Sequence, residues 1–209
     1  MYYFLALVTA AISSIMGVVN GELKNFYDLY RATVLIHLIG LIPISAVVLH
    51  KRVRVSDKTG VPWHHFLGGA VGVVTVLATA APYGYISVSA IVALSLLGQT
   101  ASSLLVEQFG LFSLARKPFD RNKLVGLVFA AAGIAVMVAG SAFSPLPVFL
   151  AFLSGVSNVV SRCINAQLAE KKGTTYSTWY NYVVGLAVSA LVMFLMLPGG
   201  KAGFPGSLS

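Results

Sequence analysis

The sequence predicts an all-α, polytopic membrane protein: a bundle of seven transmembrane helices. Three observations lead to this fold class. Of the 209 residues, 57% are hydrophobic and 10% are charged, whereas a soluble domain carries roughly 25% charged residues. Seven apolar segments come close to the length of about 20 residues that a helix needs to cross a bilayer core. Two stretches that lie 145 residues apart also resemble each other.

The seven apolar segments are rich in alanine, glycine and leucine and lack the alternation that marks barrel strands, so helices are expected to satisfy their backbone in lipid. They lie near residues 2–20, 30–49, 64–82, 86–108, 122–141, 147–168 and 177–197. No basic region precedes the first and no small-residue cleavage site follows it, so we interpret it as a membrane helix. The fifth has almost no polar side chain and is expected at the periphery. The single Cys163 excludes an internal disulfide.

Basic residues divide unevenly between the two sides of a seven-pass arrangement. Ten of them fall on the side of the N-terminus, whereas the opposite side holds three, Lys24, Arg31 and Lys201. The remaining one, Arg162, lies inside the sixth segment. By the positive-inside rule, the N-terminus is expected in the cytoplasm and the C-terminus outside, with the chain in the inner membrane. The net charge of +8 thus reflects topology, and the expected partner is the lipid bilayer and not nucleic acid. The ten basic residues on the N-terminal side are Lys51, Arg52, Arg54, Lys58, Arg116, Lys117, Arg121, Lys123, Lys171 and Lys172.

The repeat carries one polar stripe twice, over residues 4–23 and 149–168, and its register continues into the next segment. At the offset of 145, the matched pairs are Thr9 with Ser154, Ser13 with Asn158, Asn20 with Asn165, Thr33 with Thr178, His37 with Tyr182, and Gly40 with Gly185. Five membrane segments separate the start of one copy from the start of the next, and because five is odd, the second copy enters the membrane from the opposite side. This is the inverted repeat of secondary transporters. We expect one complete five-helix unit over residues 1–145 and a partial second unit over 146–209, with three helices missing.

Residues 62–112 resemble the YdcZ-type branch of the drug/metabolite transporter superfamily. The residues that carry the resemblance are Pro62, Trp63, Gly68, Gly69, Gly72, Gly98, Gln99, Ser102, Ser103 and Phe109–Phe112, with Asn20 and Asn165-Ala166 also typical. The resemblance implies an inner-membrane exporter of small molecules with ten helices or paired five-helix units. The small multidrug relatives couple export to protons through a glutamate in the first helix, where this chain has Ser13 and Ser14.

Polar side chains inside the apolar segments are the candidates for a substrate pathway. For Gln99, which shares a helix face with Ser95 and Ser102, binding of substrate and bonding between helices are weighed equally. His37 is a proton relay or a packing residue. For Asn20 and Asn165, near helix ends, capping or interhelical bonding is favoured. The candidate pathway residues are Ser13, Asn20, His37, Gln99, Ser102, Asn158, Asn165 and Tyr182.

The function expected from these features is transport of a small molecule by alternating access. The central positions carry hydroxyl and amide groups and no carboxylate, which favours a neutral or weakly polar substrate over a dication. The polar stripes of the first, fourth and sixth segments are expected to converge. No spacing resembles a metal site, a nucleophile triad or a phosphate loop, so neither an enzyme nor a cofactor is expected. The alternative is a noncatalytic membrane subunit or scaffold, or half of a carrier that borrows helices from a second copy or a partner chain.

Overall fold

A computed structural model describes residues 2–50, 60–117, 121–139 and 145–196. Over these residues each of the seven predicted segments coincides with one α-helix, and two short 3-10 helices occur between them. Lys51, Arg52, Arg54, Lys58, Lys201 and the tail from residue 198 lie outside the described residues. The elements are α1 (Tyr2–Tyr27), α2 (Leu29–His50), η1 (Trp63–Phe66), α3 (Gly68–Ala80), α4 (Val88–Phe109), η2 (Leu111–Ser113), α5 (Arg121–Ala139), α6 (Pro145–Lys172) and α7 (Thr174–Met196).

Within the described part of the chain, five helical stretches are long and apolar enough to cross a membrane. They are Leu29–His50, Trp63–Ala80, Val88–Phe109, Pro145–Lys172 and Thr174–Met196. In α5 the apolar stretch is shorter, Lys123–Val136. The all-helical bundle and its multi-pass membrane character are therefore confirmed.

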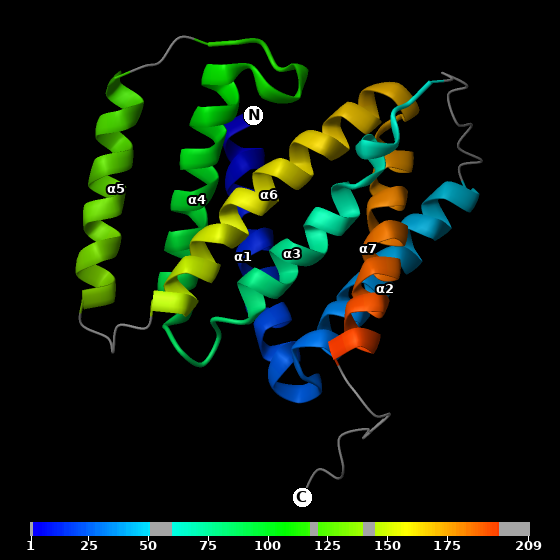
Figure 1. The fold of residues 1–209 in the computed structure, drawn as a ribbon, viewed down its shortest axis with the longest axis horizontal. Helices are drawn as coiled ribbons and strands as arrows, with labels where there is room; N and C mark the ends of the chain where they lie inside the picture. Colours follow the sequence, from blue (N-terminus) through cyan, green and yellow to red (C-terminus); the bar gives the residue numbers. More distant parts are fainter. Residues whose placement is uncertain (1, 51–59, 118–120, 140–144, 197–209) are drawn as a thin grey trace, which may run out of the picture.

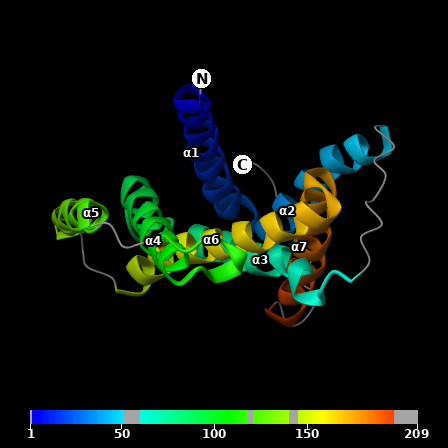
Figure 2. The same ribbon diagram turned by 90° about the horizontal axis from the view of Figure 1, so that it is seen from above.

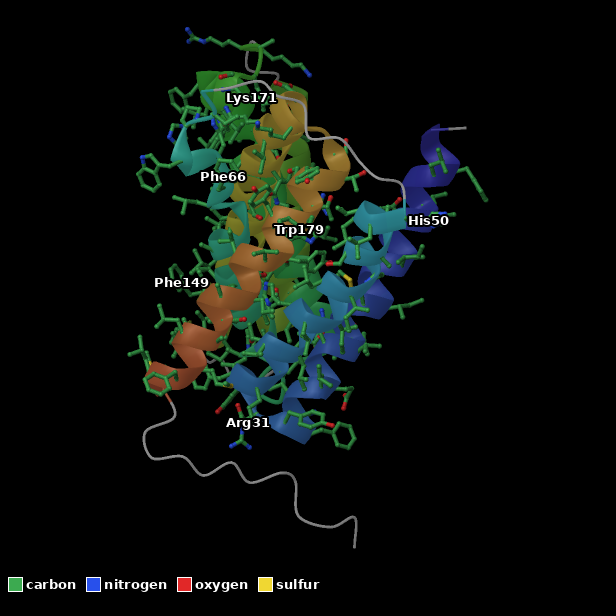
Figure 3. The ribbon with its side chains drawn as sticks, turned by 90° about the vertical axis from the view of Figure 1, so that its right-hand side faces the viewer. Arg31, His50, Phe66, Phe149, Lys171 and Trp179 are labelled. Carbon is green, nitrogen blue, oxygen red and sulfur yellow. The ribbon has the colours of Figure 1, made fainter. Side chains whose placement is uncertain are left out.

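Successive helices run in alternating directions, so the connections gather at two ends of the molecule (Figure 1). The N-terminus lies at the same end as the α4–α5 and α6–α7 connections, which carry Arg116, Lys117, Lys171 and Lys172. The α1–α2 and α3–α4 connections lie at the opposite end. Figure 3 shows Lys171 and Arg31 at these opposite ends. The chain path therefore separates the basic residues of the described connections as the sequence predicts.

The centre of the bundle is α6, which packs against α3, α4 and α7. Glycines let α4 and α6 cross with their backbones in contact. A Cβ on Gly98 would overlap the carbonyl oxygen of Phe152, and a Cβ on Gly155 would overlap that of Ser95. Such small-residue crossings are how membrane helices pack closely without a hydrophobic driving force. Beside the crossing lies an apolar cluster of Tyr83, Ile86, Ala90, Ile91, Leu94 and Ala151.

Two helices lie apart from this centre. Helix α5 stands at one edge, beside α4, with Phe129 and Val136 exposed (Figure 2). This confirms the peripheral position expected for the fifth segment. Helix α1 also projects away from the layer formed by α3, α4 and α6, and it packs against α2 and α3.

Candidate functional site

The contact between α2 and α7 is reciprocal. His37 is buried, with 3% of its surface exposed, and its ring meets the Tyr182 ring edge-on at 6.4 Å between centroids. A Cβ on Gly185 would overlap the His37 ring, and a Cβ on Gly40 would overlap the Tyr182 ring. Each large side chain thus packs on the glycine that follows the other by three positions on the facing helix. At the offset of 145, His37 corresponds to Tyr182 and Gly40 to Gly185, so the two halves of this contact are counterparts in the repeat.

The turn between α1 and α2 and the turn between α6 and α7 have the same backbone conformation. Asp28 joins α1 to α2 and Gly173 joins α6 to α7, with φ angles of 70° and 88°. Their amides donate to Lys24 O and Ala169 O at 3.0 and 2.8 Å, and their carbonyls each accept a 3.0 Å bond from the amide four residues ahead. Positive φ favours glycine. At Asp28 the carboxylate accepts bonds from the amides of Tyr30 and Arg31, which stabilises the turn.

A polar junction forms where α3, α6 and α7 meet. Asn165 Nδ2 donates to Asn181 Oδ1 at 2.8 Å, and Ser177 Oγ donates to the Asn165 carbonyl at 2.6 Å. Ser161 Oγ donates to the Gly68 carbonyl at 2.8 Å. Asn165 therefore bonds between helices and caps neither end of α6, which continues to Lys172. The interhelical interpretation of Asn165 is the one the geometry supports.

Asn181 was not among the residues predicted from the sequence. An amide inside an apolar segment was the available signal, since such groups seek partners in a membrane. The repeat pointed away from it, because its counterpart 145 residues earlier is Ile36. Gly72 faces the same junction: a Cβ there would lie 3.8 Å from Ser161 Oγ and 3.9 Å from Asn181 Oδ1.

Helices α4 and α6 bring a second set of predicted residues together. Ser154 Oγ donates to Ser95 Oγ at 3.1 Å. Gln99 is half-buried, and its Nε2 lies 3.4 Å from Ser95 Oγ on its own helix. Ser102 is buried and donates to the Gly98 carbonyl at 2.6 Å, which places its hydroxyl in a bond within α4. Asn158 is half-buried on α6.

The stripe of α1 does not join those of α4 and α6 in the described residues. Thr9 is exposed and donates to the carbonyl of Leu5 in its own helix. Asn20 is half-buried, and α1 continues beyond it to Tyr27. The side chain of Ser13 is outside the described part of the structure. Of the three stripes expected to converge, two meet, because α1 packs on α2 and α3 instead.

Two glutamates, Glu22 and Glu107, lie near the ends of α1 and α4. Glu107, near the end of α4, forms an ion pair with Lys123 at 2.8 Å and with Lys117 at 3.9 Å. Glu22 is exposed and accepts a bond from Asn25. The polar side chains of the α2–α7, α4–α6 and α6–α7 contacts are therefore amides, hydroxyls and one imidazole. Among the described residues no group of three or more His, Cys, Asp or Glu side chains could hold a metal ion.

A known protein family matches most of the chain. The family model described as "Putative inner membrane exporter, YdcZ" matches residues 1–136 and 146–205. No curated protein and no solved structure matches the chain.

Proposed function

The chain belongs to the YdcZ family of inner membrane exporters, and from this we propose that it moves a small molecule across the inner membrane by alternating access. In this mechanism two structurally related halves rock against each other and expose one site to each side in turn. The N-terminus lies in the cytoplasm, and residues 1–145 and 146–209 are the two unequal units.

The reciprocal packing of His37 on Gly185 and of Tyr182 on Gly40 carries this proposal. Adding 145 to His37 and Gly40 gives Tyr182 and Gly185, so the offset turns one half of the contact into the other half. A two-fold axis between α2 and α7 produces this arrangement. The matching left-handed turns at Asp28 and Gly173 support the same axis. Opposite directions of α1 and α6 agree with an axis in the membrane plane (Figure 1).

The substrate class is inferred from the polar groups of the candidate pathway, which lie at the α2–α7, α4–α6 and α6–α7 contacts. His37, Gln99, Asn158, Asn165 and Tyr182 offer donors and acceptors without a carboxylate. A cation would find no counter-charge among them, and its desolvation in the membrane interior would remain uncompensated. We therefore place a neutral or weakly polar molecule on this route, with His37 and Tyr182 flanking it.

Transport in liposomes tests the proposal, with the protein purified together with any chain that remains bound to it. Neutral amides and polyols are expected to accumulate faster than in empty liposomes, while dicarboxylates and quaternary ammonium ions are not. Gln99→Leu keeps the bulk of the side chain and removes its hydrogen bonds, so it should slow transport without unfolding the protein. Absence of transport for every compound would favour the alternative of a noncatalytic membrane subunit.

The exposure of α1 favours one form of the carrier, in which another chain completes the pathway. In α6, Ser157 and Ser161 are 7% exposed beneath the neighbouring helices. Their counterparts in α1, Ile12 and Met16, are 60% and 57% exposed. We infer that helices from a second copy or a partner chain cover this face of α1 in the working assembly.

A further inference from the structure

We propose that Lys24 and Tyr83 form a latch that closes the outer end of the transport pathway. The inference rests on the proposed function, because it assigns a state to the alternating-access cycle. It concerns the connection between α3 and α4, residues 81–87, and the last turns of α1. Neither Lys24 nor Tyr83 belongs to the candidate pathway residues.

The latch consists of hydrogen bonds in both directions. Lys24 Nζ donates to the carbonyl oxygens of Ala81 and Tyr83 at 3.1 and 3.0 Å. Tyr83 Oη donates in return to the carbonyl oxygen of Gly17 at 2.9 Å. The ammonium group also lies 5.8 Å from the centre of the Tyr85 ring, within the range of a cation–π contact. A cation beside the carbonyls that follow the C-terminus of α3 further complements the helix dipole.

The close packing of Tyr83 against α1 supports the same contact. The Tyr83 ring lies flat on Gly21, where a Cβ would overlap three ring atoms, and only 6% of Tyr83 is exposed. Earlier in α1, Ile12 and Met16 are exposed. Within the described residues, the side-chain hydrogen bonds between α1 and the α3–α4 connection involve Gly17 and Lys24, in the second half of α1. A helix held to its neighbour at one end can swing when that end is released.

The position of the latch in the molecule indicates which end of the pathway it closes. The α1–α2 turn and the α3–α4 connection share the end of the molecule opposite the N-terminus (Figure 1). In the proposed orientation this end faces outwards. The structure accordingly holds the outer end closed, and outward opening requires Lys24 to leave the two carbonyls and Tyr83 to leave Gly21.

Cysteine labelling from outside tests the latch without a known substrate. In a Cys163→Ala background, the reporter is Ala80→Cys, at a position that is 3% exposed next to the Ala81 carbonyl. The probe is a membrane-impermeant maleimide added to intact cells. One hydrogen bond in a membrane shifts an equilibrium by about threefold on average. Loss of the bonds in Lys24→Met with Tyr83→Phe should therefore raise the labelling rate by about tenfold or more.

Matched variants separate opening from unfolding. Asn25→Ala removes a bond inside α1, to Glu22, and should leave the reporter protected. Lys24→Arg keeps a cation with several donors and should restore protection. Ala151→Cys, fully buried in α6, should stay protected in every variant. Should the Lys24→Met variant fail this control, Tyr83→Phe alone, which removes one oxygen atom, is expected to raise labelling about threefold.

A second reporter separates the latch from the proposed orientation. Tyr85→Cys, on the same connection at an exposed position, should label from outside in all variants. If it does so while Ala80→Cys remains protected in the double variant, the latch is overturned and the orientation stands. If Tyr85→Cys labels only from the cytoplasmic side, the orientation and the outward assignment of the latch are both overturned.

Discussion

Asn165 and Asn181 show what an amide does in the interior of this bundle. An unpaired amide in hydrocarbon is costly, and the two side chains satisfy one another across α6 and α7. Ser161, Ser177 and the Gly68 carbonyl extend the network, so its five members come from three helices. A network of this kind fixes the register of α3, α6 and α7 while leaving hydrogen-bonding capacity for a polar ligand.

Replacing one of these amides tests the network. Asn181→Leu should lower the free energy of unfolding by about 0.6 kcal/mol, the average for a membrane hydrogen bond, and by no more than about 1.7 kcal/mol. Denaturation in mixed micelles measures the change. Asn165→Leu combined with Asn181→Leu should cost less than the sum of the single changes, because the lost bond is shared. Strict additivity would contradict the bond, and Asn158→Leu provides a half-buried amide as control.

At this scale the sequence predicts some residues better than others. The register of the repeat predicted that His37 and Tyr182 occupy equivalent positions, but their direct ring contact emerged only from the structure. Asn181 was missed because the repeat places an apolar Ile36 opposite it. Ser102 stays a predicted pathway residue, and the structure adds that its hydroxyl donates to a carbonyl of its own helix. Sequence register identifies helix faces, whereas the partner of each polar atom depends on backbone distances that only the packed structure defines.

Among the elements, α4 and α6 make the closest crossing. Gly98 and Gly155 face each other's helix backbone, so the interhelical distance is limited by main-chain atoms and not by side chains. The polar pair Ser95 and Ser154 lies at the same crossing. Because main-chain atoms limit the distance between α4 and α6, this crossing should behave as a rigid part of the bundle.

Enlarging a glycine at the crossing should separate the two helices. Gly155→Val would place carbon atoms against the Ser95 carbonyl and the Gln99 amide, and overpacking of this kind costs about 1–3 kcal/mol or more. The melting temperature in detergent should fall accordingly. Gly133→Val on α5 is the matched control, since a Cβ there meets nothing within 4 Å. Equal loss of stability in both variants would contradict a close α4–α6 crossing.

Helices α1 and α6 are counterparts in the repeat but differ in exposure, because Ile12 of α1 is exposed and its counterpart Ser157 of α6 is buried. If another chain covers α1, a photo-crosslinking side chain at Ile12 should capture protein in native membranes. The same group at Phe129 on α5, which is also exposed, should capture lipid. The mass of the product distinguishes a second copy from a different chain. Capture of lipid alone at Ile12 would show that α1 faces the bilayer.

For the whole molecule, composition and hydropathy were enough to predict an all-helical membrane bundle and the positions of its helices. The physical reason is that a bilayer requires long apolar segments with internal backbone hydrogen bonds. The position of α1 was not predictable in this way, because lipid solvates an apolar helix as well as protein does. Polar stripes alone therefore could not decide whether α1 joins α4 and α6.

The proposed two-fold relation makes a prediction that concerns the molecule as a whole. If α1–α2 and α6–α7 are related by an axis through the His37–Tyr182 contact, the environments of these two side chains are equivalent. His37 Nδ1 lies 2.8 Å from the carbonyl oxygen of Thr33, four residues earlier. Four residues before Tyr182 the chain again has a threonine, Thr178. A histidine at either position therefore has the same local acceptor and faces a glycine on the opposite helix.

Exchanging the two side chains uses this equivalence. His37→Tyr alone should destabilise the protein by about 1–3 kcal/mol, because the larger ring must fit against Gly185, where the His37 ring already leaves no room for a Cβ. Adding Tyr182→His restores one large and one small ring across the axis, so the double variant should recover most of the lost stability. Unfolding in mixed micelles of the wild type, both single variants and the double variant gives the coupling energy. A double variant as unstable as the sum of the single variants would mean that the two sites are not equivalent. The repeat would then describe the sequence without describing the symmetry of the molecule.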